Sequence, residues 1–205
     1  LLPPENPAAD YSVRIWTPTG ELPFAGHPTL GSAFVWLGLG IAPKGSDIVQ
    51  ECAAGLIRIR AAANRLAFAA PPLTRSGPVE AATLDQIFQA LSLEPSDVLA
   101  SNWIDNGPGW IGLFLRDHGQ MMRVAPEYAR LAGLRIGLAA CGGRHDLELR
   151  AFTGAGFEDP VTGSLNAGMA QWLIGAGHMP ATYVASQGAV LGRRGVIHIT
   201  QDDGE

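Results

Sequence analysis

The sequence has little of several features that mark particular classes of protein. Its 205 residues include 14 Lys or Arg against 19 Asp or Glu, and the net charge of −5 disfavours nucleic acid as a partner, because phosphate binding needs a basic surface. Two cysteines, Cys52 and Cys141, are too few for a disulfide framework and indicate a reducing compartment. No apolar run reaches the length of a membrane span, and no secretory signal pattern opens the chain. We therefore expect a cytoplasmic globular protein with no nucleic-acid and no membrane partner.

The residues that are abundant indicate a folded, turn-rich chain. Hydrophobic residues make up 47% of the sequence and charged residues 16%, which is typical of a globular core. Gly (26) and Pro (15) are frequent enough to favour a β architecture with many turns over a helical bundle. This length permits one large domain or two small lobes.

The chain is organised around one stretch near its C-terminal end. The acids and turn residues of 158–164 (EDPVTGS) run into the apolar segment 165–174 (LNAGMAQWLI), which has the character of a helix. Ser or Thr at such a point caps free N–H groups, and a Gly beside it allows a close approach. The positive end of the helix would bind an anion, and a neighbouring carboxylate could move protons. The alternative is a capped, buried helix without chemistry.

The same order of residues occurs twice. Arg14–Thr17 and Arg150–Thr153 both read Arg-x-aromatic-Thr, and each is followed by a turn, a Gly, a polar residue and an apolar helix. Each helix ends in glycines, Gly38 and Gly40 in the first copy and Gly175 and Gly177 in the second, and a strand-turn-strand pattern follows. An internal repeat of this kind predicts two pseudo-symmetric lobes with His27 and Ser164 at a shared cleft.

Periodicity predicts the remaining elements. Alternation of apolar and polar residues predicts a strand over 12–16, and an apolar, small-residue segment predicts a buried helix over 29–39. The segment 48–68 reads as strands. Thr83–Gln86 has the form of a capping box at the start of an amphipathic helix that runs to Leu91, which we expect to be structural.

Two long motifs, taken in order, resemble the signatures of a known family. Glu21–Gly31 (ELPFAGHPTLG) and Glu158–Ser164 are similar to the two signatures of the phenazine-biosynthesis PhzF-like family, which shares the fold of diaminopimelate epimerase. Gln187–Gly188 and Gly192–Arg193 resemble the family's C-terminal strand pair. The resemblance runs from about Tyr11 to the end of the chain.

The resemblance implies an α+β fold of two pseudo-symmetric lobes. Each lobe would be a curled, mostly antiparallel β-sheet or barrel around a central helix. We expect residues 1–72 to form the N-terminal lobe and residues 73–205 the C-terminal lobe, whose last strands could return toward the first. An open sheet edge invites pairing, so we also expect a homodimer.

The resemblance also implies the site. As catalytic residues we expect His27, Asp159 and Ser164, and as substrate-binding residues Gly26, Pro28, Thr162, Gly163, Asn106 and Gly107. Glu158 is expected to be partly structural, with Arg14 and Arg150 bracing the acidic loops rather than binding substrate. The four other histidines have no spacing of a metal site, so no metal is expected.

The implied reaction is the isomerisation or epimerisation of a small carboxylic acid by proton transfer, without a cofactor. The family's acid–base glutamate lies in a Ser-Glu-Thr-type turn that would precede Leu1, and Glu5 does not take its role. We expect Cys52 and Cys141 to have no part in catalysis, because a cysteine-pair racemase would carry Cys where His27 and Ser164 stand. Two alternatives stay open, an inactive relative that binds small anions and a fragment that needs a partner copy to fold.

Overall fold

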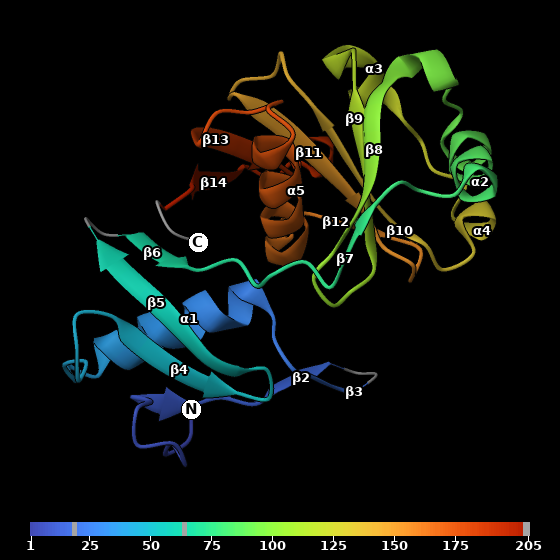
Figure 1. Cartoon of the computed structure of the whole chain (residues 1–205). Coiled ribbons are helices and arrows are strands. Elements are labelled where there is room, and N and C mark those ends of the chain that lie inside the picture. The colour runs from blue at the N-terminus through green and yellow to red at the C-terminus, as the bar shows by residue number, and fades with distance from the viewer. Residues whose placement is uncertain (18–19, 63–64, 203–205) are drawn as a thin grey trace. The chain divides into compact units, whose positions relative to one another are not determined.

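The computed structural model describes residues 1–17, 20–62 and 65–202, and its chain divides into two compact units, Leu1–Ala70 and Pro71–Glu205 (Figure 1). The first unit consists of β1 (Tyr11–Ser12), β2 (Ile15–Thr17), β3 (Gly20–Leu22), α1 (Gly26–Gly38), β4 (Ile48–Cys52), β5 (Gly55–Ala62) and β6 (Arg65–Phe68). Its main sheet has the order β1-β4-β5-β6, and β2 and β3 form a separate hairpin. Only the β1–β4 pair of this sheet is parallel.

The core of the first unit lies between this sheet and α1. Val13 and Ile15 are buried while Arg14 and Trp16 between and beside them are exposed, so the predicted alternation is confirmed. Ala33 and Trp36 of α1 pack in the same cluster as Ile48 and Ile59 of the sheet, together with Tyr11, Val13 and Ile15. The helix begins at Gly26, so the prediction of a start at Thr29 was three residues late.

The second unit is built on a larger sheet. Its strands are β7 (Arg75–Gly77), β8 (Val98–Asp105), β9 (Trp110–Leu115), β10 (Arg135–Ala140), β11 (Leu147–Phe152), β12 (Glu158–Asp159), β13 (Thr182–Gln187) and β14 (Gly195–Thr200). They take the order β14-β13-β11-β10-β9-β8-β7, with β12 paired to β11. Its helices are α2 (Ala81–Leu91), α3 (His118–Arg123), α4 (Tyr128–Leu131) and α5 (Gly163–Gly175), with short 3₁₀ turns at Pro95–Asp97 and Ala189–Leu191.

Two hydrophobic clusters cover opposite faces of this sheet. Along β9, Ile111, Leu113 and Leu115 pack with α2, whereas Trp110 and Phe114 pack with α5, as the two-residue period of a strand requires. Figure 1 shows α5 against one side of the sheet and α2 with α4 against the other. The helix α5 is therefore the central helix of the unit and is buried over most of its length.

Small residues allow α5 to lie close to the sheet. A Cβ atom on Gly137 of β10 would lie 2.2 Å from Leu165 Cδ1, and one on Gly112 of β9 would lie 2.9 Å from Trp172 Cζ3. A Cβ atom on Gly168 of the helix itself would lie 2.5 Å from the carbonyl oxygen of Ile104. The sheet backbone thus contacts helix side chains at Gly112 and Gly137, and the helix backbone contacts the backbone of β8 at Gly168.

The predicted α+β class and the repeated order of elements are confirmed. In each unit a two-stranded hairpin leads into a helix of 13 residues and then into an antiparallel strand pair. Gly40 and Gly177, two residues beyond the helices, have positive φ angles of 73° and 72°. No sheet within the described residues closes into a barrel, which corrects that part of the prediction.

The predicted capping box of α2 is wrong. The helix begins at Ala81 after Glu80, and no side chain caps it, so Thr83 lies inside the first turn. The amide of Thr83 donates instead to the carbonyl oxygen of Glu80. The amphipathic face was predicted correctly, since Ile87 and Leu91 belong to the core.

Candidate active site

The second signature begins in the hairpin of β11 and β12. In this hairpin Phe152 lies opposite Glu158 and Ala151 opposite Asp159. Arg150 donates from Nε and Nη2 to the two carboxylate oxygens of Glu158, at 2.9 and 2.7 Å, and both side chains are less than a tenth exposed. The Glu158 carboxylate is thus held by a bidentate ion pair.

The same guanidinium ties the hairpin to the C-terminal end of α3. Arg150 Nη1 donates to the carbonyl oxygens of Met121 (2.9 Å) and Val124 (2.7 Å). All three guanidinium nitrogens are therefore engaged with protein groups. This confirms the predictions that Arg150 braces the acidic loop and that Glu158 is partly structural.

The start of α5 has free donors rather than a cap. Thr162 precedes the helix with an extended backbone but makes no capping bond, so the predicted side-chain cap is wrong. The amides of Gly163, Ser164 and Leu165 form the first turn, and the first backbone bond into the helix is from Asn166 N to Thr162 O at 3.0 Å. Uncapped N–H groups at the positive end of a helix favour an anion.

Asp159 is joined to this helix start through Thr162. The Thr162 hydroxyl donates to Asp159 Oδ2 at 2.7 Å, and its oxygen accepts from Gln187 Nε2 at 3.1 Å rather than from an amide of the helix. Asp159 is half-buried, so its carboxylate is held in place beside the helix start without being sealed off. A fixed carboxylate next to an anion site can accept or supply a proton for a bound acid.

The side chain of Gln187 holds the loop between β12 and α5 through four hydrogen bonds. Its Oε1 accepts from Thr162 N (3.0 Å) and Asn166 Nδ2 (2.8 Å), and its Nε2 donates to Asp159 O (2.9 Å) and Thr162 Oγ1 (3.1 Å). The side chain is 1% exposed. The next residue, Gly188, has φ of +94°, and a Cβ there would lie 2.5 Å from the carbonyl oxygen of Pro160.

The turn before β9 contacts Ser164 from another direction. Asn106 Nδ2 donates to the carbonyl oxygen of Ser164 at 2.9 Å, and the indole N–H of Trp110 donates to Ser164 Oγ at 3.0 Å. Asp105 Oδ1 accepts from Gly107 N and Gly109 N and so fixes the turn. Asn106 thus contacts the start of α5, whereas the amide of Gly107 donates to Asp105 and its residue is exposed, and the substrate-binding role of both stays a prediction.

The first unit carries a second group of predicted residues. Arg14 forms a bidentate pair with Glu21 at 2.8 Å for both bonds, which confirms the predicted bracing of this hairpin. Gly26, His27 and Pro28 open α1, and no side chain caps this helix either. His27 is exposed, and its backbone N–H and that of Gly26 are the donors there, because Pro28 has none.

Each of the two helices is supported by a glutamine of a strand, α1 by Gln50 and α5 by Gln187. Thr29 and Asn166 are the fourth residues of α1 and α5, and each is hydrogen-bonded to a buried glutamine, Gln50 or Gln187. In the first unit Gln50 Nε2 donates to Thr29 Oγ1 at 3.0 Å and Tyr11 donates to Gln50 Oε1 at 3.1 Å. The repeat therefore extends to the contacts that hold each helix start.

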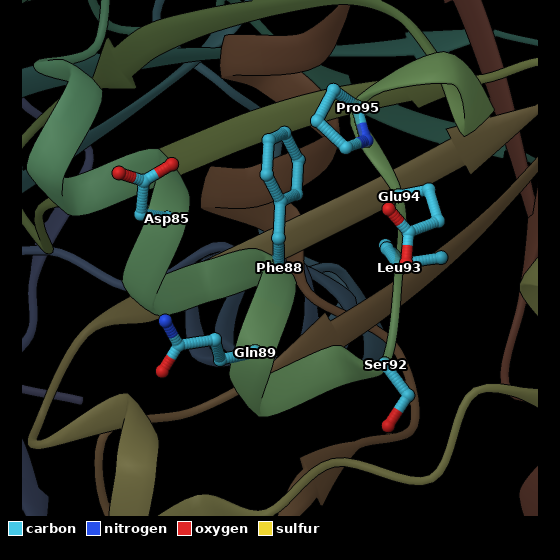
Figure 2. Close-up of a pocket in the computed structure, with 7 residues that line it drawn as sticks. All are labelled: Asp85, Phe88, Gln89, Ser92, Leu93, Glu94 and Pro95. Carbon is cyan, nitrogen blue, oxygen red and sulfur yellow. The ribbon is translucent and has the colours of Figure 1, made fainter.

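A separate surface hollow lies beside α2 and contains none of the predicted residues (Figure 2). It is lined by Asp85, Phe88, Gln89, Ser92, Leu93, Glu94 and Pro95. Because α2 and α5 cover opposite faces of the sheet, this hollow is distant from the start of α5. None of the residues that line it contacts Asp159, Thr162 or Ser164 in the described part of the chain.

Known proteins share this sequence and this fold. A family model for phenazine biosynthesis-like proteins, PhzC-PhzF, matches residues 1–205. The chain belongs to the PhzC-PhzF family. Antisense-enhancing sequence 1 of Schizosaccharomyces pombe is 31% identical over 95% of this chain and 72% of that protein. Trans-2,3-dihydro-3-hydroxyanthranilate isomerase of Pseudomonas chlororaphis is 29% identical over 76% of this chain and 51% of that enzyme.

Solved structures agree on the PhzC-PhzF fold. A PhzF-family protein from Enterococcus faecalis matches with a TM-score of 0.75 and 20% identity, covering 97% of this chain and 73% of that one. The predicted family and epimerase-like fold are therefore confirmed. Membership of the PhzC-PhzF family and the isomerase among its relatives support an isomerase.

Two further results concern the part of the PhzC-PhzF chain that the structure describes. Among the residues that the structure describes, no group of three or more His, Cys, Asp or Glu side chains could hold a metal ion. Within the same ranges, no helix has the length and hydropathy that a membrane span requires.

Sequence reasoning missed two residues of this PhzC-PhzF site. Gln187 was noted only as part of a strand motif, and Trp110 was not noted as a site residue. Gln187 has a sequence signal, because Gln50 stands in the matching strand of the first copy. Trp110 has none, since only the folded chain brings it to Ser164.

Proposed function

We propose that this protein is a cofactor-independent isomerase or epimerase that moves a proton on a small carboxylic acid. The start of α5 would bind the substrate carboxylate through the amides of Gly163, Ser164 and Leu165. The Ser164 hydroxyl would donate to the same carboxylate, and Asp159 would handle a proton next to it. The observation that carries this proposal is the uncapped start of α5 with a carboxylate fixed beside it.

The start of α1 is the counterpart of this helix start in the first unit. His27, as the second residue of α1, corresponds to Ser164 in α5, and Leu22 corresponds to Asp159. The two copies therefore supply different chemistry, a carboxylate and a hydroxyl from one and an imidazole from the other. We assign His27 to hydrogen bonding or proton relay.

The substrate class follows from the anion site and from one relative. The Pseudomonas chlororaphis isomerase acts, by its name, on trans-2,3-dihydro-3-hydroxyanthranilate, which carries a carboxylate. A compound of this class would place its carboxylate at the helix start and its neighbouring C–H bond within reach of an acid or base. Preorganised donors at a developing anion and a positioned base are each established sources of rate enhancement.

A second candidate function is the binding of small anions without catalysis. It is favoured by the ion pair that the Glu158 carboxylate of the second signature already makes. Both oxygens of Glu158 are held by Arg150, so Glu158 is no substitute for the acid–base glutamate that the resemblance implies. Asp159 alone would then have to move the proton.

Proton exchange in heavy water separates the two functions. The protein is incubated in D₂O with trans-2,3-dihydro-3-hydroxyanthranilate, and ¹H NMR follows the loss of a C–H signal and the appearance of an isomer. We expect deuterium incorporation, and Asp159→Asn should reduce its rate by about 10²–10⁴-fold. Asp85→Asn, in the hollow beside α2, is the matched control and should keep the wild-type rate.

One result would contradict the isomerase and another the role of Asp159. Binding of the compound without any deuterium incorporation would favour the anion-binding function. A wild-type rate in Asp159→Asn would remove Asp159 from the mechanism.

A further inference from the structure

The indole of Trp110 makes an unusual contact for a core residue. Trp110 is 3% exposed and packs in the same cluster as Leu165 and Met169 of α5. The rest of the indole has apolar neighbours, but its Nε1–H donates a hydrogen bond to Ser164 Oγ at 3.0 Å. The bond joins the first residue of β9 to the second residue of α5.

This contact makes the Ser164 oxygen an acceptor toward Trp110. An indole N–H is a donor only, whereas a hydroxyl has one proton and two lone pairs. Ser164 Oγ must therefore be the acceptor, and its own proton remains for another partner. Within the described residues no acceptor receives that proton, so the hydroxyl is left as a donor.

The geometry is held rigidly from the turn that precedes β9. Asp105 accepts two backbone N–H groups of the turn, at 2.7 Å from Gly107 and 2.6 Å from Gly109. Asn106 donates to the main-chain oxygen of Ser164, so the turn grips both the backbone and the side chain of this residue. Asn106 Oδ1 is itself buried and has no partner among the described residues.

We propose that Trp110 is a positioning residue that sets the Ser164 hydroxyl as a donor to the substrate carboxylate. This inference rests on the proposed function, since it assigns the hydroxyl to the carboxylate bound at α5. Without the indole N–H, the hydroxyl could rotate and donate to a nearby backbone acceptor instead, as serines in helices do. Trp110 would then contribute to affinity while touching no substrate atom.

Titration calorimetry with anthranilate as the carboxylate probe tests the proposal on four proteins. These are the wild type, Trp110→Phe, Ser164→Ala and the double variant. Loss of the donor to a carboxylate in Ser164→Ala should weaken binding by about 10- to 100-fold, and loss of the orienting bond in Trp110→Phe by about 3- to 10-fold. In the double variant the affinity should equal that of Ser164→Ala, because Trp110 acts only through Ser164.

Trp103→Phe is the matched control. The indole of Trp103 donates to Glu80 Oε2 at 3.1 Å, so this variant also loses an indole hydrogen bond, but at α2 rather than α5. It should bind anthranilate as the wild type does. If Trp110→Phe weakened binding through a general loss of packing, the fold-losses of affinity in the two single variants would multiply in the double variant. If it acts only through Ser164, the double variant should lose no more affinity than Ser164→Ala.

A second measurement does not require Trp110→Phe to fold. The wild-type protein with ¹⁵N-labelled indoles should show five side-chain signals, one for each Trp. The signal that moves in Ser164→Ala belongs to Trp110, and it should also shift when anthranilate is added.

The outcomes are distinguishable. Wild-type affinity in Trp110→Phe, multiplicative losses in the double variant, or an indole signal unmoved by ligand would overturn the role of Trp110 and leave the proposed isomerase intact. Absence of anthranilate binding by the wild type at millimolar concentration would overturn both.

Discussion

Arg14 and Arg150 occupy the same place in two copies of one hairpin, and both lie over the ring of an aromatic residue two positions later. Their guanidinium carbons are 5.0 Å from the Trp16 ring and 4.9 Å from the Phe152 ring. The ion pairs differ in burial, since the side chains of Arg150 and Glu158 are 4% and 8% exposed and those of Arg14 and Glu21 56% and 29%. Solvent screens an exposed pair, whereas a buried charge that loses its partner is costly.

The two pairs make a matched test of this difference. Glu158→Gln leaves the Arg150 charge buried without its counter-ion and should lower the free energy of unfolding by about 3–5 kcal/mol. Glu21→Gln, the same change in the exposed copy, should leave the urea midpoint unchanged. Equal midpoints for the two variants would show that burial of the Arg150–Glu158 pair has no energetic consequence.

At the scale of elements, α1 and α5 are two copies of one helix in different surroundings. Gly31 and Gly168 are the sixth residues of these helices. Gly168 faces the carbonyl oxygen of Ile104, whereas a Cβ atom on Gly31 would meet nothing within 4 Å. The glycine of α5 is therefore needed for packing, and that of α1 is not.

Alanine at the two positions should have opposite effects. Gly168→Ala forces α5 away from β8 and should destabilise the protein by about 1–3 kcal/mol. Gly31→Ala should stabilise it by about 0.5–1 kcal/mol, because Ala is the better helix former. Urea denaturation followed by circular dichroism measures both, and a neutral Gly168→Ala would contradict the close approach of helix and sheet.

The features of the fold that could be predicted are those that depend on residues close together in the sequence. The strand alternation at Val13 and Ile15, the glycine stops of both helices and the repeat itself are local patterns, and the structure confirms them. The predicted cap of α5 was wrong, because the Thr162 side chain is directed to Asp159 and Gln187 rather than to the amides of the helix. Nothing in the segment 158–164 reveals that choice, which depends on Gln187 arriving from β13.

The candidate site shows the same limit. Asp159, Thr162, Gly163 and Ser164 are contiguous and could be placed together from the sequence. The contact of Trp110 with Ser164 spans 54 positions and arises from the pairing of β9 in the sheet. The predicted homodimer and the cytoplasmic location stay predictions.

For the whole molecule, the tyrosines report on both units at once. Burial raises the pKa of all three, Tyr11 in the first unit and Tyr128 and Tyr183 in the second, above the ordinary value near 10. A phenol is charged only after it loses its proton, so the folded state holds these protons more tightly than the unfolded state. The stability that this supplies is present below pH 10 and is lost as the pH rises further.

An alkaline titration should therefore be cooperative. In guanidinium chloride the phenolate absorbance at 295 nm should rise near pH 10. In the native protein it should rise at a higher pH. In the native protein we expect it to rise together with the loss of the circular dichroism signal. Phenolate formation near pH 10 with unchanged circular dichroism would contradict the burial of these side chains.

The most direct measurement is an NMR titration of the backbone amides with anthranilate. If the start of α5 binds the carboxylate, the largest shifts should fall on Gly163, Ser164 and Leu165. In Ser164→Ala the same amides should shift at higher ligand concentration. Shifts confined to the hollow beside α2, or no shifts at the first turn of α5, would contradict a substrate site at this helix start.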